Sequence, residues 1–323
     1  MNAAQSEVSS VRRAIGALRR IGAQAWNNPI TRRELRGRMR DRRIPVILIA
    51  HMLLAGCLAS VAYLAIGGPA QAMAGPGGRS AGQTLWYGAY MLLLTEVALF
   101  SPALTTGSIS GEREQKTLDV LVTTLLFPQR LVLGKLTAAL VYVALLLLVT
   151  VPVLAMAVLL GDISLPEIAV GTAILGATAL VTAAIGICIS SLTRSVLAST
   201  AWTYVAILLV GVGAPTLALI PAAFLGITLS LAMERLHWVV QALVVYGSGM
   251  LVCTNPFVAA IAAKVLAEGK GSWLAFTALV TGPDGVPHAL PLLSPWIVYV
   301  VLCIGTGAVL TWVSIRAVEY RRG

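Results

Sequence analysis

Residues that could perform chemistry are few and widely separated in this sequence. The three histidines, His51, His237 and His288, are far apart, and the four cysteines include no C-x-x-C pair. Neither pattern predicts a metal site or a disulfide framework. Residues 111–117, GEREQKT, end like a phosphate-binding loop, but Gln115 stands where such a loop needs a glycine. We therefore predict no catalytic residue, no directly bound cofactor and no ATPase site in this chain.

Glu96 is the one acidic residue placed deep in a long apolar run, near the middle of 85–106. An ionised carboxylate facing lipid would cost several kcal/mol, so such residues usually face a bundle interior or a water path. Two interpretations remain open. Glu96 either fixes helix packing through a hydrogen bond, or it lines a pathway or a subunit seam.

The composition indicates a membrane protein. Of the 323 residues, 58% are apolar and 11% are charged, and the mean hydropathy is +0.88. In a water-soluble domain about a quarter of the residues would be charged. The 23 Lys and Arg exceed the 13 Asp and Glu, which suits an anionic lipid surface, and the hydropathy argues against nucleic acid as a partner.

Long apolar runs predict membrane-spanning helices, because about 20 apolar residues of helix cross a bilayer core of about 30 Å. We expect an all-α integral membrane protein with spans at about 44–66, 85–106, 131–160, 166–190, 196–220 and 295–317. Within 221–294 the apolar segments are short or are broken at Asn255-Pro256. Six spans with re-entrant extracytoplasmic segments and eight spans therefore both remain open.

The distribution of Lys and Arg predicts the orientation. With six spans, 19 of these residues fall on the side that holds both termini and four on the other. Both termini should be cytoplasmic, in a bacterial-type inner membrane. The segment 1–43 contains eleven arginines and is expected to be a basic amphipathic interface segment that precedes the transmembrane domain 44–323. Within it, Thr31 and Glu34 have the spacing of a capping box, which would open a helix that ends near Arg43.

The connection between the second and third expected spans carries the most informative pattern. Apolar residues at i, i+3, i+4 and i+7 predict a short amphipathic helix over about 112–126, with Ser110 as a capping residue and Pro128 beyond its end. The apolar stripe consists of Leu118, Leu121, Val122 and Leu125.

The charges on this helix bear on its role. Glu112 and Glu114 stand in the first turn, where the helix dipole favours acids, beside Arg113 and Lys116. A helix that only lies on the bilayer would favour Lys and Arg on its polar face. Surface binding remains open, but the mixed charge suits a protein partner better.

Residues 110–136, SGEREQKTLDVLVTTLLFPQRLVLGKL, resemble the coupling-helix region of ABC-2-type ABC transporter permeases. In that region S-G-E-R-E, an amphipathic helix, a proline and G-K-L follow one another. Three further stretches resemble the family in order. They are Asn28-Pro29 with the basic run 31–43, the stretch 191–204, and Asn255-Pro256-Phe257.

The resemblance implies an ABC-2-type permease fold and a subunit of an ATP-driven exporter. A separate ABC ATPase subunit would bind ATP and Mg²⁺, and a second permease subunit, identical or similar, would complete the membrane part. A secondary transporter driven by an ion gradient and a non-transporting membrane anchor or scaffold remain as alternatives. Nothing in the sequence selects a substrate.

The resemblance also implies roles for particular residues. The helix over 112–126 would dock into a cleft of the ATPase subunit and transmit its closure to the spans. The implied coupling residues are Glu112, Arg113, Glu114, Leu118, Leu121 and Val122. The basic helix before the first span would border both the membrane surface and the ATPase, through Arg32, Arg33, Glu34 and Arg36.

Overall fold

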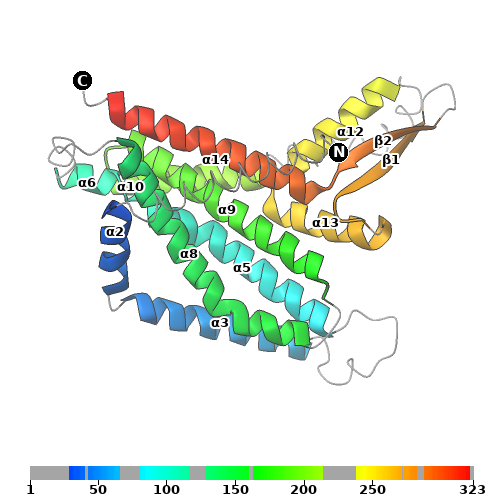
Figure 1. Cartoon of the computed structure of the whole chain (residues 1–323), viewed down its shortest axis with the longest axis horizontal. Coiled ribbons are helices and arrows are strands. Elements are labelled where there is room, and N and C mark those ends of the chain that lie inside the picture. Colours follow the sequence, from blue (N-terminus) through cyan, green and yellow to red (C-terminus); the bar gives the residue numbers. More distant parts are fainter. Residues whose placement is uncertain are drawn as a thin grey trace, which may run out of the picture.

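The structure is a computed structural model. It describes residues 29–40, 43–65, 81–116, 128–159, 163–213, 238–270, 272–281 and 287–320. Most of these residues are helical, and the long helices run side by side in one bundle (Figure 1). The expectation of a helical membrane fold is confirmed.

The long helices of the bundle come from the most apolar parts of the sequence. In the described part, four segments are long and apolar enough to cross a membrane, and they contain α5 with α6, α8, α9 and α14. The bounds are α5 Ala81–Thr106, α6 Ser110–Glu114, α8 Pro128–Leu159, α9 Leu165–Leu192 and α14 Pro295–Glu319. Before them, α2 covers Pro29–Arg40 and α3 covers Arg43–Ala65. The 23 residues of α3 give about 34 Å of helix.

The helix α9 forms the centre of the bundle and contacts α5, α8, α10 and α14. Its glycines permit close approach: a Cβ atom on Gly186 would overlap Thr105 Oγ1 of α5, and one on Gly171 would meet the Tyr90 ring at 3.0 Å. The main buried cluster includes Leu93 and Leu94 of α5 and further apolar residues of α8, α9, α13 and α14. Packing between α5 and α9 therefore supports the rest of the fold.

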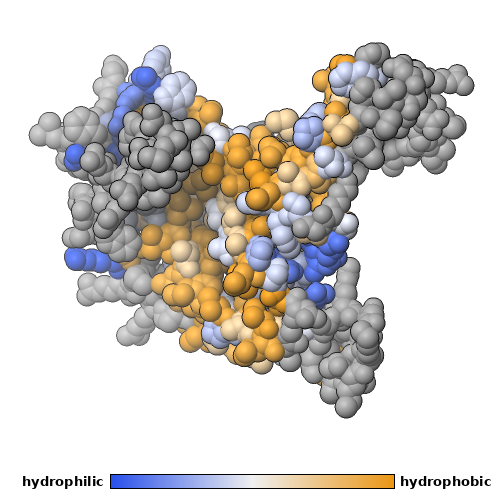
Figure 2. All heavy atoms as spheres, turned by 45° about the vertical axis from the view of Figure 1, so that its right-hand side comes forward, coloured by the Kyte–Doolittle hydropathy of each residue, from blue (hydrophilic) through white to orange (hydrophobic). Residues whose placement is uncertain are grey.

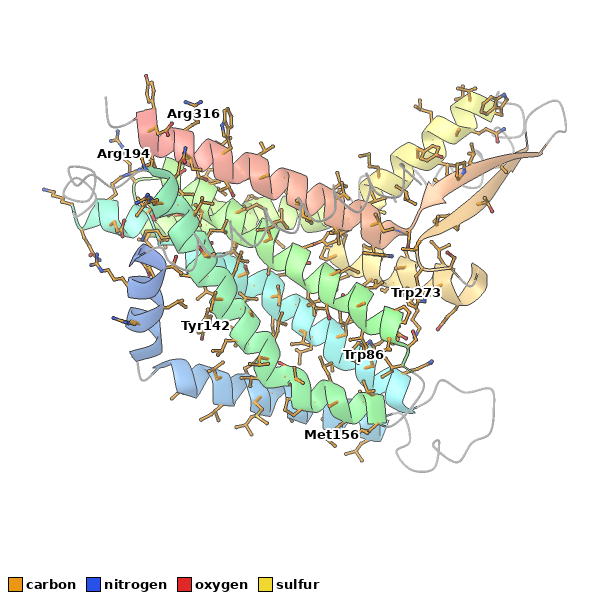
Figure 3. The ribbon with its side chains drawn as sticks, viewed as in Figure 1. Trp86, Tyr142, Met156, Arg194, Trp273 and Arg316 are labelled. Carbon is orange, nitrogen blue, oxygen red and sulfur yellow. The ribbon has the colours of Figure 1, made fainter. Side chains whose placement is uncertain are left out.

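The two ends of the bundle carry different residues. Arg194 and Arg316 lie at one end, near α6, whereas Trp86 and Trp273 lie at the opposite end, near α13 (Figure 3). We call these the α6 end and the α13 end. Between them, apolar side chains cover most of the face seen in Figure 2. This distribution fits a protein whose middle faces lipid hydrocarbon.

The helix α10, Val196–Leu208, continues into the π-helical turn η1, Leu209–Gly213. After the residues outside the described part, α12 covers Trp238–Val252 and α13 covers Pro256–Lys270. Each of these two has 15 residues, or about 22 Å of helix, which is shorter than a bilayer core. They meet at the break predicted at Asn255-Pro256, where Asn255 Oδ1 accepts hydrogen bonds from the backbone N–H groups of Phe257 and Val258.

An antiparallel hairpin was not anticipated from the sequence. Its strands are β1, Ala275–Thr281, and β2, Pro287–Leu293, with Ala275 opposite Leu293. Together with α12 it diverges from the bundle at the α13 end (Figure 1), and Tyr246 of α12 donates a hydrogen bond to the carbonyl of Pro291. The fold is thus helical with one small two-stranded element.

Candidate functional site

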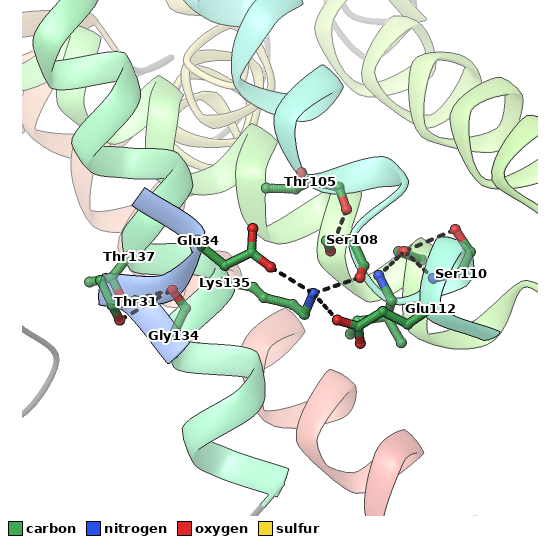
Figure 4. A network of polar contacts seen from close by, with 11 residues as sticks. Thr31, Glu34, Thr105, Ser108, Ser110, Glu112, Gly134, Lys135 and Thr137 are labelled. Carbon is green, nitrogen blue, oxygen red and sulfur yellow. Dashed lines mark hydrogen bonds and ion pairs between the residues drawn. The ribbon is translucent and has the colours of Figure 1, made fainter. Parts of the chain in front are cut away.

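Lys135, in the first turns of α8, joins three segments at the α6 end. Its side chain is 4% exposed. The ammonium donates to Glu112 Oε1 of α6 at 2.7 Å, to Glu34 Oε1 of α2 at 3.2 Å and to the Ser108 carbonyl at 2.8 Å (Figure 4). A Lys ammonium has three donors, and each of them has a partner here. We call Lys135, Glu112, Glu34 and Ser108 the Lys135 cluster.

The helix α2 is placed against α8 by two residues on one face. Thr31 Oγ1 donates to the Gly134 carbonyl at 3.4 Å, and Glu34 pairs with the next residue, Lys135. Residues three apart share a helix face, so this spacing brings both side chains to α8. The predicted helix start differs from the structure, because α2 begins at Pro29 and Thr31 lies inside it. Proline is favoured at a first helical position, where its missing N–H is not needed.

The short helix α6 differs from the predicted helix over 112–126. It begins at Ser110, ends at Glu114 and is followed by a turn in which Lys116 has a φ of 56°. That left-handed conformation cannot continue a right-handed helix. Residues 117–127 lie outside the described part, and with them Leu118, Leu121 and Val122.

Ser110 is the first residue of α6, not its cap. The free N–H groups of a helix start need an acceptor, and here the acceptor comes from another helix. Ser190 Oγ of α9 accepts from the N–H groups of Ile109, at 3.1 Å, and of Ser110, at 3.0 Å. The start of α6 is therefore fixed to the end of α9.

Arg113 fixes α6 to the turn between α9 and α10. Its guanidinium donates to the carbonyls of Thr193 and Ser191. On the same side, the Val196 side chain would lie within 3.5 Å of a Cβ atom placed on Gly107 or Gly111. The segment around α6 contacts α8 through Glu112 and the α9–α10 turn through Arg113. A displacement of α6 should therefore also displace the adjoining ends of α8, α9 and α10.

The remaining predicted residues of the site lie on its outer side. Glu114 is exposed at the end of α6, and Arg33 and Arg36 are exposed on α2. The side chain of Arg32 lies outside the described part. Between α2, α6 and α8 is a pocket of about 290 Å³ that Glu34, Glu112 and Lys135 line. The structure thus brings together Glu34 and Glu112, which the sequence assigned to separate segments.

Sequence reasoning missed the roles of Lys135 and Ser190. A signal for Lys135 was present: it is a lysine at the start of an apolar span, within the G-K-L stretch. Such a lysine needs a buried anionic partner or access to water. No comparable signal existed for Ser190, because serine is common in membrane helices and its contact is 80 residues away along the chain.

Glu96 lies on the side of α5 that faces α3 and α8. It is 7% exposed, and its Oε2 lies 2.7 Å from His51 Nδ1 of α3. The other ring nitrogen, Nε2, lies 2.8 Å from Thr150 Oγ1 of α8. The structure therefore gives Glu96 a buried partner that the scattered histidines of the sequence did not reveal. Within the described ranges, no group of three or more His, Cys, Asp or Glu could hold a metal ion.

A second charged cluster lies at the α13 end. Lys264 Nζ of α13 lies 3.5 Å from Glu167 Oε1 of α9 and 3.4 Å from Glu268 Oε1. It also lies 3.5 Å from the centre of the Tyr87 ring of α5, a cation–π contact, and Tyr87 donates a hydrogen bond to Glu167. The side chains of Lys264 and Glu167 are 12% and 10% exposed. This Lys264 cluster ties α13 to the two central helices.

Comparison with known proteins places part of the chain in a described family. A family model described as ABC-2 family transporter protein matches residues 28–243, which is more than half of the chain. The matched range includes every residue of the Lys135 cluster, as well as His51 and Glu96. Among curated proteins, none matches the chain.

Proposed function

Because the chain belongs to the ABC-2 transporter family and is therefore the multi-pass permease component of an ABC-type transporter, we propose that it couples ATP hydrolysis to export. The permease of this family is a transport component and not itself the catalytic one, and membership implies association with an ABC ATPase subunit. The proposal adds that this separate subunit binds ATP and Mg²⁺ and drives movement of the spans.

The observation that carries the proposal is the Lys135 cluster. It connects the segment that begins with α6 to the first turns of α8 through a buried charge, while Arg113 connects α6 to the α9–α10 turn. A partner that pushes on α6 would therefore act on α8, α9 and α10 together. The exposed residues Glu114, Arg33 and Arg36 would face that partner.

The proposed cycle has two states. Closure of the ATPase pair on ATP pushes α6, and the spans rock from an inward-open to an outward-open arrangement, as in other transitions biased by a ligand. Two permease subunits, identical or similar, take part. In this proposal the α6 end and both termini are cytoplasmic, and the membrane is a bacterial-type inner membrane.

Charge reversal at an exposed residue tests the proposed contact without disturbing the Lys135 cluster. Glu114→Lys should reduce copurification of the ATPase subunit and its stimulated hydrolysis, because a rim charge controls association. Glu319→Lys is the matched control, since Glu319 is acidic and near Arg316 at the same end of the bundle (Figure 3). Equal copurification with wild type, Glu114→Lys and Glu319→Lys would remove Glu114 from the contact, and transport without any ATPase would refute the function.

The buried pair of His51 and Glu96 favours a second candidate, a transporter driven by a proton gradient. Buried carboxylate and histidine residues in spans mark proton pathways in several transporters. Uptake or efflux in vesicles that have a pH gradient but no ATP would support this candidate. ATP-dependent transport that is insensitive to the gradient would exclude it.

A further inference from the structure

A pocket among the described residues lies inside the bundle, away from both charged clusters. It has a volume of about 340 Å³ and is bounded by α5, α9, the end of α10 with η1, the start of α13, and α14. Ligand pockets have volumes of about 300–1,000 Å³ and are lined mainly by apolar side chains. Its apolar lining includes Leu99, Val181, Ile185, Leu208, Phe257 and Leu302.

The chemistry of this lining excludes a charged ligand. Among the described residues that line the pocket, none is Asp, Glu, Lys, Arg or His. Four of the five lining threonines have hydroxyls that are already engaged, because each donates to the carbonyl four residues earlier in its own helix. These residues are Thr95, Thr178, Thr182 and Thr306.

Tyr299 and Asn255, which also line the pocket, are engaged as well. Tyr299 OH lies 2.8 Å from Thr178 Oγ1. Asn255 Nδ2 donates to the Gly211 carbonyl at 2.6 Å, and its Oδ1 accepts from the start of α13. A polar ligand would lose its hydrogen bonds to water and find few in return, and burying unpaired polar groups is unfavourable. The pocket suits a hydrocarbon.

The pocket opens to the outside of the bundle through exposed apolar residues. Three of its lining residues, Leu99 of α5, Leu208 of α10 and Val210 of η1, are 51%, 61% and 50% exposed. Their exposed apolar side chains meet lipid chains in a membrane. Apolar cavities stay dry, and an unfilled void loses the contacts of its lining atoms. In a membrane, the apolar group available to occupy this pocket is therefore the acyl chain of a neighbouring lipid.

We propose that this pocket between α5, α9, α10–η1 and α14 binds one acyl chain of a bilayer phospholipid, which enters sideways between α5 and α10. The headgroup stays outside the pocket, since no charged residue in the described lining would receive it. This site is independent of ATP coupling, and the inference does not need the ATPase subunit.

The test uses the full chain in liposomes made with a phospholipid that carries a diazirine in the middle of one acyl chain. Irradiation should label Thr182 and Cys303, two lining residues that are each 5% exposed and that lipid on the outer surface cannot reach. Leu53, which is 68% exposed on α3, reports ordinary surface lipid and should be labelled as well.

Two matched variants distinguish labelling by a lipid in the pocket from labelling by a lipid on the outer surface. Leu302→Trp fills the pocket and should abolish labelling of Thr182 and Cys303, while Leu53 stays labelled. Val301→Trp changes the neighbouring residue of α14, which is 62% exposed and does not line the pocket, and it should leave all three labels intact. Because labelling is read without ATP, it does not depend on whether the chain couples to an ATPase.

Labelling of Leu53 without Thr182 and Cys303 in the wild-type chain would overturn the proposal. Equal labelling of Thr182 in both tryptophan variants would overturn it too. A diazirine free fatty acid that labels the pocket when the phospholipid does not would contradict the proposed source of the chain.

Discussion

Replacing Lys135 by methionine tests the central connection of the site. Methionine keeps the length and the apolar stem of lysine but removes its charge and its three donors. Glu112, Glu34 and the Ser108 carbonyl would each lose this partner, at distances of 2.7, 3.2 and 2.8 Å in the structure. We expect the segment 107–116 to separate from α8 more often, and transport to fall with it.

The size of the effect follows from burial. Removing one partner of a fully buried ion pair costs about 3–5 kcal/mol. The side chains of Glu112 and Glu34 are 23% and 30% exposed, so water partly compensates them. We therefore expect a cost at the lower end, about 3 kcal/mol. Since each 1.4 kcal/mol is tenfold in an equilibrium constant, local opening should increase roughly 100-fold.

Hydrogen–deuterium exchange measures this opening directly, because amides in a locally opening segment exchange at a rate set by its opening free energy. In Lys135→Met, the amides of 107–116 should exchange much faster, while those of 256–270 should not change. Lys264→Met is the matched control, because the Lys264 side chain is only 12% exposed and has carboxylate partners at the opposite end. It should accelerate exchange in 256–270 and leave 107–116 unchanged.

Unchanged exchange of 107–116 in Lys135→Met would refute the reasoning. A double-mutant cycle with Glu112→Gln gives a second check, since residues in direct contact show non-additive effects of about 0.5–3 kcal/mol. If the effects of Lys135→Met and Glu112→Gln on the opening free energy were strictly additive, the contact between the two side chains would contribute nothing to that free energy. Wild-type transport in Lys135→Met despite faster exchange would show that this connection does not transmit coupling.

Two further predictions concern the packing and the buried pair. Gly186→Ala should lower the thermal midpoint, at a cost of about 1–3 kcal/mol, because the new Cβ overlaps Thr105; Gly176→Ala, with nothing within 4 Å, should leave the midpoint equal or raise it. Glu96→Gln keeps the size of the side chain but removes its charge, so the close contact with His51 should weaken. Transport should fall with the assembly intact if Glu96 acts in the pathway, and unchanged transport would limit Glu96 to packing.

The helices were predictable because their cause is local. The apolar runs at 85–106, 166–190 and 295–317 lie within α5, α9 and α14, since length and hydropathy along the chain decide whether a helix suits a bilayer. The break at Asn255 was also predictable, because asparagine before proline is a local stop signal.

The contacts that build the site were not predictable, because they join distant parts of the chain. Glu34 and Lys135 are 101 residues apart, and His51 and Thr150 are 99 apart. No spacing rule within one helix brings such residues together. The start of α6 was misplaced for the same reason: its N–H groups are satisfied by Ser190 of another helix and not by a local cap.

The hairpin was missed for a different reason. The sequence of β2, PHALPLL, contains two prolines, and proline within an apolar run argues against a strand because it cannot donate to a neighbour. The strand forms at the edge of a two-stranded sheet, where that missing donor is tolerated. A local rule therefore does not identify this strand, because the tertiary arrangement decides at this position.

The length of α9 has a mechanical consequence. Its 28 residues give about 42 Å of helix, with Glu167 near its beginning and Ser190 near its end. By simple geometry, a tilt of about 10° around Ser190 would carry Glu167 through about 6 Å, more than the 3.5 Å that separates Glu167 from Lys264. A small tilt of α9 at the α6 end would thus produce a larger displacement at the α13 end. The contact between Glu167 and Lys264 would then break although nothing binds near it.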